Sequence, residues 1–220
     1  MLVAGVDEAG RGCVVGPLVI AGVLMKEENL PLLRRLGVKD SKLLSAKKRE
    51  ALSLEIARLA EKRVVVKLSP VEIDRVVESG RKLHKLNRLE AQVMAQVIAA
   101  LKPDEAYVDA ADVVEDRFKH HIQEGLPFKA KVIAKHKADR TYLVVSAASI
   151  IAKVERDREI AALTGEYGDF GTGYLTDPKT MRFLRQWLET HGEYPDCVRK
   201  SWKPAKQAKS EKGTVQKRLA

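Results

Sequence analysis

The stretch Gly5-Val6-Asp7-Glu8-Ala9-Gly10-Arg11-Gly12 follows an apolar N-terminal run and joins two segments with the composition of strands, residues 1–8 and 14–25. It sets two adjacent carboxylates, Asp7 and Glu8, at the end of a strand that we expect to be buried. Like charges in such a place repel each other, and burial raises both pKa values unless a cation is bound. Because hard divalent cations take oxygen ligands, the stretch predicts a metal site.

The turn Gly10-Arg11-Gly12 adds groups that suit a phosphate. Glycine lets the backbone approach a bulky ligand, and arginine offers a planar fork of donors. Together with the carboxylates, these groups predict a metal-assisted phosphodiester site. A polar turn that closes a hairpin would explain the glycines but not the acids. A dinucleotide-binding loop, suggested by Gly10, Gly12 and Gly16, is disfavoured because two carboxylates would oppose the pyrophosphate.

The length of 220 residues and the hydrophobic content of 45% suit one full domain, or one domain with an appendage. The chain has no apolar run of about 18 residues and no basic segment ahead of an apolar one, so we expect no membrane span and no signal peptide. A cytoplasmic location is the resulting expectation. Cys13 and Cys197 lie far apart without zinc-like spacing, which predicts free thiols.

Positive charge is concentrated at the C-terminus. The whole chain carries +10, and residues 198–220 hold eight basic residues against one acidic residue. Such a tail is typical of a surface that binds a polyanion, although a solvated helix or a frayed terminus has the same composition. If the tail binds a polyanion, truncation after Pro204 should weaken that binding.

The order of expected elements favours an α/β fold with a mixed sheet flanked by helices. Residues 1–8 and 14–25 form an antiparallel pair, and further strands and helices then alternate. The expected strands are 63–68, 105–108 and 128–134, and the expected helices are 29–37, 45–62, 70–77, 86–101, 113–123, 139–162 and 178–191.

Two more acids follow strands. Asp109 stands at the carboxyl end of the strand 105–108, where α/β sheets place ligand-binding groups. Asp112 is expected to cap the helix 113–123. Asp139 follows the strand 128–134, and its local pattern alone indicates a carboxylate in the first turn of a helix. His136, a lone histidine in a lysine-rich loop, is expected to be solvated.

Four motifs in order resemble the ribonuclease HII family, most closely its archaeal members. They are the opening Asp-Glu-Ala-Gly-Arg-Gly with Val-Gly-Pro at 15–17, Lys-Asp-Ser-Lys at 39–42, Lys-Ala-Asp at 137–139 with Val-Ser-Ala-Ala-Ser-Ile-Ile-Ala-Lys-Val at 145–154, and Gly-Thr-Gly-Tyr at 171–174. The similarity runs from residue 1 to about residue 204. One common variant of the opening has proline where this chain has Cys13, outside the acids and the turn.

The resemblance implies a ribonuclease H-like catalytic domain over residues 1–176 and a basic, helical, substrate-binding extension over residues 177–220. It implies a catalytic site in which four acids bind two divalent ions, Mg²⁺ or Mn²⁺: Asp7, Glu8, Asp109 and Asp139. It further implies substrate contacts from Gly10, Arg11, Gly12, Lys42 and Tyr174.

The implied activity is hydrolysis of the phosphodiester 5′ of ribonucleotides, leaving 3′-hydroxyl and 5′-phosphate ends. The implied partners are RNA/DNA hybrids and duplex DNA that contains ribonucleotides, in the setting of ribonucleotide removal from DNA. We expect a monomer, and a sliding clamp is a further candidate partner. The alternatives are a ribonuclease HIII-like hybrid nuclease, which typically carries an additional N-terminal domain, a non-catalytic hybrid-binding protein, and another metal-dependent nuclease or integrase-like enzyme.

Overall fold

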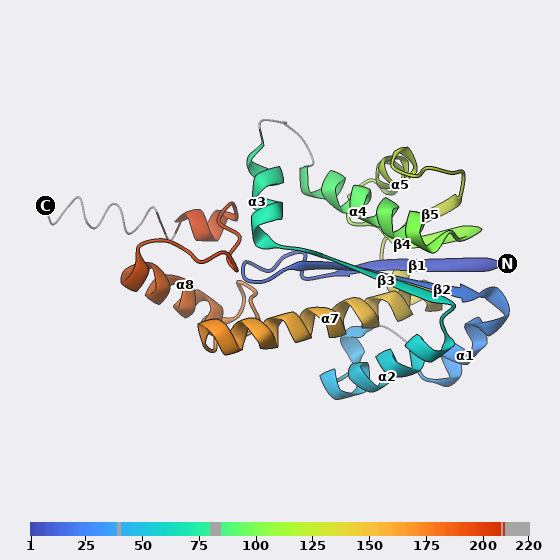
Figure 1. Ribbon diagram of the computed structural model, residues 1–220, viewed down its shortest axis with the longest axis horizontal. Coiled ribbons are helices and arrows are strands. Elements are labelled where there is room, and N and C mark those ends of the chain that lie inside the picture. Colours follow the sequence, from blue (N-terminus) through green and yellow to red (C-terminus); the bar gives the residue numbers. More distant parts are fainter. Residues whose placement is uncertain (39–40, 80–84, 208, 210–220) are drawn as a thin grey trace, which may run out of the picture. The chain divides into compact units, whose positions relative to one another are not determined.

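The computed structural model describes residues 1–38, 41–79, 85–207 and 209 (Figure 1). The chain forms two compact units. The first unit comprises Met1–Ala9, Val19–Lys67 and Lys82–Arg156, and the second comprises Gly10–Leu18, Leu68–Arg81 and Asp157–Ala220. The domain boundary expected at residue 176 stays a prediction.

A five-stranded sheet forms the centre of the first unit, in the order β3-β2-β1-β4-β5. The strands are β1 (Leu2–Ala9), β2 (Leu18–Lys26), β3 (Lys62–Leu68), β4 (Glu105–Asp109) and β5 (Lys131–Lys135). Strand β1 is antiparallel to β2 and parallel to β4, and β4 is parallel to β5. The predicted mixed sheet, with its antiparallel pair, is therefore confirmed.

Two glycines let helices pack directly on opposite faces of this sheet. A Cβ atom on Gly5 would lie 2.2 Å from the carbonyl oxygen of Val144, at the start of α7 (Leu143–Tyr167). A Cβ atom on Gly22 would lie 2.4 Å from Val97 Cγ1 in α4 (Lys85–Leu101). Gly22 pairs with Val6, the neighbour of Gly5, and successive strand residues face opposite sides. Helices α4 and α7 thus cover the two faces, as Figure 1 shows.

The remaining helices of the first unit lie between the strands or follow the last of them. They are η1 (Glu27–Asn29), α1 (Leu30–Arg35), η2 (Ser41–Leu43), α2 (Ala46–Leu59), α5 (Glu115–Glu124) and α6 (Ala138–Thr141). The predicted cap at Ser45 is confirmed, since its side chain accepts a hydrogen bond from Lys48 N–H. The helix expected over 139–162 is two helices, because Tyr142 between α6 and α7 is extended.

The cap predicted at Asp112 is wrong. Helix α5 begins at Glu115, and its N-cap residue is Val114. The Asp112 carboxylate instead accepts hydrogen bonds from Val114 N–H, at 3.0 Å, and from the Arg117 guanidinium. Because Asp112 bonds a loop amide and a side chain in the first turn of the helix, it connects the loop to α5 rather than starting the helix.

The second unit contains α3 (Pro70–Glu78), α8 (Pro178–His191) and the C-terminal part of α7. Ser69 forms the predicted capping box with Glu72, and Asp177 caps α8 as predicted. Val14, Val15, Phe170, Leu184 and Val198 belong to one buried cluster in this unit, along with Leu188, Tyr194, Cys197 and Ala205. Cys13 and Cys197 are both free, as expected, and both are buried.

The strand expected over 14–25 begins four residues later, at Leu18. Pro17 cannot donate a ladder hydrogen bond. Residues 13–15 pair elsewhere in the second unit, through isolated bridges from Cys13 to Tyr174 and from Val15 to Val198. No helix in the described part of the chain is long and apolar enough to cross a membrane.

Candidate active site

Parallel strands bring three of the four predicted acids to one edge of the sheet. Asp7 lies near the carboxyl end of β1, and Asp109 is the last residue of the parallel strand β4. Asp139 lies in α6, which follows the next parallel strand, β5. The carboxyl edge of a parallel sheet is where α/β proteins bind ligands.

The negative charges of Asp109 and Asp139 act on the Asp7 carboxylate. Its side chain is buried, and the burial raises its pKa to about 7, with the negative charge of Asp109 adding to the rise and that of Asp139 contributing less. Hydrogen bonds from the Ser149 hydroxyl and from Glu8 N–H oppose the rise, the latter at 2.8 Å. Asp7, Asp109 and Asp139 therefore form one acidic cluster.

Backbone and serine groups hold this acidic cluster in place. Asp109 Oδ1 accepts a hydrogen bond of 3.0 Å from Ala138 N–H, directly before the buried Asp139. The Ser146 hydroxyl on α7 donates to the Asp139 carbonyl oxygen. Ser149, one turn further along, lies 2.9 Å from the Ser41 hydroxyl and bonds Asp7 as well. Two serines of α7 thus hold the acidic cluster: Ser149 bonds the Asp7 carboxylate, and Ser146 bonds the backbone of Asp139.

Glu8 joins the cluster through its backbone. It follows Asp7 on β1, so its side chain leaves the strand on the opposite face. The residue is half-buried, and its Oε2 atom is shielded from solvent. A role of the Glu8 carboxylate in metal binding remains a prediction.

The acidic cluster suits a hard divalent cation by its chemistry. Within the residues that the structure describes, no three His, Cys, Asp or Glu side chains stand close enough to enclose an ion. Nevertheless, the donors of the cluster are all carboxylate oxygens, which Mg²⁺ and Mn²⁺ prefer. Burial and the neighbouring charges disfavour the ionised form of Asp7, and a bound cation would offset both effects.

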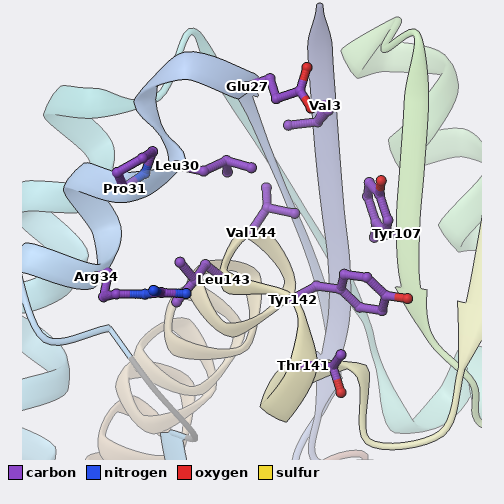
Figure 2. A pocket seen from close by; sticks show the side chains of 10 residues that line it. All are labelled: Val3, Glu27, Leu30, Pro31, Arg34, Tyr107, Thr141, Tyr142, Leu143 and Val144. Carbon is purple, nitrogen blue, oxygen red and sulfur yellow. The ribbon is translucent and has the colours of Figure 1, made fainter.

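A cavity of about 350 Å³ lies in the same unit, beside β1 and β4. Its lining includes Tyr107 and Tyr142, whose ring centroids are 4.6 Å apart, and Figure 2 shows the two rings side by side. None of the four acids lines this cavity. The acidic cluster is therefore separate from this cavity.

The predicted substrate-binding residues other than Lys42 lie in the second unit. Gly10 has a left-handed backbone (φ 83°), which favours glycine. Gly12 is exposed, and a Cβ atom added there would meet nothing within 4 Å. The packing of the described residues therefore does not require glycine at position 12, and its contact with a substrate stays a prediction.

Tyr174 is held beside the turn by backbone hydrogen bonds. Gly173 O accepts from Val14 N–H at 2.8 Å and from Val15 N–H at 3.2 Å, and Tyr174 forms a bridge with Cys13. The glycine-rich loop is therefore connected to the residues that directly follow Gly12. Lys42 lies in η2, and its side chain is outside the described part of the structure.

Sequence reasoning missed Arg199, which it counted as part of the basic tail. The side chain of Arg199 is fully buried and donates hydrogen bonds to the carbonyl oxygens of Gly10, Arg11 and Gly16. The nearby Val198 and Trp202, apolar residues in a polar segment, are the signal that could have indicated burial. Ser146 and Ser149 belong to the motif at 145–154, and their position in the apolar first part of α7 is a signal of polar partners.

Comparisons with known proteins agree with one another. The sequence model of the family described as Ribonuclease HII matches residues 4–205. Ribonuclease HII from Pyrococcus abyssi is 48% identical over 208 residues, which cover 94% of this chain and 90% of the relative. The crystal structure of ribonuclease H2 from Pyrococcus horikoshii superposes with a TM-score of 0.88 at 45% identity, covering 96% of this chain and 98% of that one. The structure of the PCNA:RNase HII complex from Archaeoglobus fulgidus matches with a TM-score of 0.83 at 45% identity, over 92% of this chain and 96% of the other.

Proposed function

The chain belongs to the ribonuclease HII family of metal-dependent endonucleases, and we propose from this premise that it cuts the phosphodiester 5′ of ribonucleotides. The substrates are RNA/DNA hybrids and duplex DNA with single embedded ribonucleotides, and the products carry 3′-hydroxyl and 5′-phosphate ends. The observation that carries the proposal is the buried acidic cluster, in which Asp109 and Asp139 act on the pKa of Asp7. Such a cluster is costly for the fold alone.

The acidic residues Asp7, Glu8, Asp109 and Asp139 would hold two Mg²⁺ or Mn²⁺ ions. When bound, such ions activate a water nucleophile and stabilise the leaving oxygen of an in-line displacement. The chain's own groups then serve to hold the carboxylates. Ala138 N–H fixes one oxygen of Asp109, and Ser149 and Glu8 N–H orient Asp7. Carboxylates fixed in this way reorganise little when the substrate arrives.

Selectivity for ribose requires groups that sense the 2′-hydroxyl, because that atom distinguishes RNA from DNA at a single nucleotide. The peptide groups of Gly10, Arg11 and Gly12 are the proposed sensors, and the open space at Gly12 supports a close approach of backbone and sugar. Tyr174 would pack its ring on the adjacent deoxyribose. Lys42 would contact a substrate phosphate.

A sliding clamp is a second proposed partner, supported by the clamp complex of the Archaeoglobus fulgidus relative. We also propose that the protein is a monomer and acts in the cytoplasm, in ribonucleotide excision repair. Calorimetric titration with a purified clamp tests the clamp proposal. The full chain should bind, and the absence of heat at micromolar concentrations of both proteins would remove this partner.

One cleavage assay separates the proposed enzyme from its alternatives. A labelled DNA duplex with one embedded ribonucleotide is incubated with Mg²⁺ or Mn²⁺, beside an all-DNA duplex and a continuous RNA/DNA hybrid. We expect a single cut 5′ of the ribonucleotide and no cut in the all-DNA duplex. A hybrid-binding protein would bind without cutting. A ribonuclease HIII-like hybrid nuclease would cut only the continuous RNA/DNA hybrid.

A further inference from the structure

We infer that Arg199 is a positioning residue that fixes the Gly10-Arg11-Gly12 turn for substrate recognition. The inference deepens the proposed function and rests on it. Arg199 comes from the far end of the chain, yet its side chain is fully buried against the turn in the second unit. A buried guanidinium is costly unless its donors are satisfied, so its hydrogen bonds indicate what it does.

The guanidinium donates hydrogen bonds to backbone carbonyl oxygens of the turn. Nη1 donates to Arg11 O at 2.7 Å, and Nη2 donates to Gly10 O at 2.6 Å. Nε and Nη2 both donate to Gly16 O, at 3.2 and 3.1 Å, so the same group also holds the end of the loop. Three carbonyls of one loop thus converge on a single side chain.

These bonds determine where the N–H groups of the turn point. A trans peptide unit is planar, and its C=O and N–H point in opposite directions. Because the carbonyls of Gly10 and Arg11 face Arg199, the N–H groups of Arg11 and Gly12 face away from it. A carbonyl that accepts from a cation also polarises its peptide unit and strengthens the N–H as a donor. The turn therefore presents two oriented donors to a phosphate or a ribose hydroxyl.

Arg199 is itself held in place by backbone pairing and an aromatic ring. Arg199 N–H donates to Val14 O at 2.8 Å, and Gly16 N–H donates to Cys197 O at 2.8 Å. The guanidinium carbon lies 5.0 Å from the centre of the Trp202 ring. The residue cannot shift without opening this pairing, so its position is as rigid as the segment that carries it.

Lysine could not replace this arginine. Its ammonium keeps the charge, but it is a single point with three donors, whereas the planar guanidinium reaches separated carbonyls at once. Arg199→Lys therefore tests the fork geometry rather than the charge. The matched control is Asp74→Asn, since Asp74 binds Lys200 N–H at 2.7 Å and Ser201 N–H at 3.0 Å in the same segment without contacting the turn.

The experiment measures kcat and KM on the single-ribonucleotide duplex, well below the melting temperature of every variant. Because a small misplacement of binding groups is costly, we expect Arg199→Lys to lose roughly tenfold in kcat/KM, chiefly through KM. Asp74→Asn should lose thermal stability and stay within about twofold of wild type in kcat/KM. Wild-type kinetics in Arg199→Lys, or an equal loss in Asp74→Asn, would overturn the inference. A wild-type protein that cuts no ribonucleotide duplex would instead overturn the proposed function.

A second measurement uses the wild-type chain and so does not depend on the folding of a variant. In EDTA, which prevents cleavage, the duplex is titrated into ¹⁵N-labelled protein. The amide signals of Arg11 and Gly12 and the Nε–H signal of Arg199 should shift together with one affinity. Shifts of the two turn amides with an unmoved Arg199 signal would show that the guanidinium does not act through the turn.

Discussion

At the scale of single residues, two buried carboxylates behave in opposite ways: Asp7, within the acidic cluster, and Asp112, three positions after Asp109. Burial and neighbouring acids raise the pKa of Asp7 to about 7. Asp112 is equally buried, but hydrogen bonds from Arg117 and from Val114 N–H hold its pKa well below the ordinary range. Hydrogen bonds within the fold stabilise the ionised form of Asp112. The ionised form of Asp7 is instead disfavoured by burial and by the charge of Asp109, and a bound cation would offset both effects. This contrast is what we expect if Asp112 has a structural role and Asp7 binds a cation.

The first prediction follows from the lowered pKa of Asp112. A carboxylate of this kind stabilises the fold above its unfolded pKa of about 4, and the contribution is lost as pH falls toward the lower folded value. Asp112→Asn should therefore cost roughly 2 kcal/mol at neutral pH, the scale of hydrogen bonds to a charged group. Urea unfolding between pH 2 and pH 7 measures the difference. The variant and wild-type curves should converge in acid.

The control for this prediction is Asp116→Asn, on the exposed side of the same helix. Its stability should follow wild type at every pH, because exposed charges contribute little. An Asp112→Asn curve that runs parallel to wild type over the whole pH range would show that packing, and not ionisation, causes the loss.

The second prediction concerns Tyr174. Loss of an aromatic stacking contact with a nucleic acid costs roughly 1–3 kcal/mol. Tyr174→Ala should therefore lose that much transition-state stabilisation on a single embedded ribonucleotide, which is measured as a fall in kcat/KM. Tyr174→Phe keeps the ring and should isolate the contribution of the hydroxyl group. Since backbone bonds from Val14 and Val15 fix the loop, melting temperatures should change little.

The measurement for Tyr174 compares the single-ribonucleotide duplex with a continuous RNA strand in the wild type and both variants. A larger loss on the single ribonucleotide indicates recognition of the junction. If Tyr174→Ala loses stability and keeps its activity, the residue only packs the loop.

At the scale of elements, the Gly-Arg-Gly turn contains two glycines with different reasons to be glycine. Gly10 needs a left-handed backbone, and Gly12 has open space around its α-carbon. The third prediction is that Gly10→Ala costs about 1 kcal/mol in stability, because a side chain is strained at positive φ. Gly12→Ala should keep the melting temperature and lose kcat/KM, since its new methyl group would stand between backbone and substrate.

Thermal melting and cleavage kinetics on both alanine variants check this pair. Each glycine thus serves as the control of the other. If Gly12→Ala cleaves at the wild-type rate, the backbone at this position does not approach the substrate.

The elements also show what the sequence could and could not predict. Helical periodicity and caps such as Ser45, Ser69 and Asp177 located most helices correctly, because these signals act within a few residues. The late start of β2 was missed, since the partners of residues 13–15 lie some 160 to 180 positions away. No local pattern reports such pairing.

The difference between local signals and distant partners also decided which site residues the sequence could predict. Strand ends and the family resemblance identified Asp7, Asp109 and Asp139, which the structure brings together. Arg199 was beyond reach, because composition counts a charge and does not say whether it is buried. Asp112 was misjudged for a related reason: its main partner, Arg117, lies inside the helix that Asp112 was expected to start.

At the scale of the whole molecule, the fourth prediction concerns the basic tail. Lys206 and Lys209 form exposed ion pairs with Glu78 and Glu193, and Ala205 is part of the buried cluster of the second unit. Truncation after Pro204 would therefore also damage the fold. A chain that ends after Lys209 loses Lys212, Lys217 and Arg218 and keeps every residue of that cluster as the structure describes it.

The chain that ends after Lys209 should bind the duplex more weakly and cut it at the same position. Each lost phosphate contact should flatten the dependence of log K on log salt by about one unit of slope. Binding measured by fluorescence anisotropy over a series of salt concentrations gives the slope. If affinity and slope are unchanged, the lost residues do not contact the duplex.

The acidic cluster at the sheet edge is the proposed site of metal-dependent cleavage. Asparagine is the suitable replacement, because Asp7→Asn and Asp109→Asn keep the acceptor oxygens for Glu8 N–H and Ala138 N–H while removing the charge. Asp112→Asn is the matched control, a buried carboxylate close to Asp109 that the fold alone satisfies.

The decisive measurement is turnover of the single-ribonucleotide duplex at saturating Mn²⁺, with a melting curve for each protein. Wild type and Asp112→Asn should cut 5′ of the ribonucleotide. Asp7→Asn and Asp109→Asn should fall to background while melting at or above the wild-type temperature, since each relieves repulsion between buried carboxylates. A folded Asp7→Asn protein that still cuts at a near-normal rate would contradict the account.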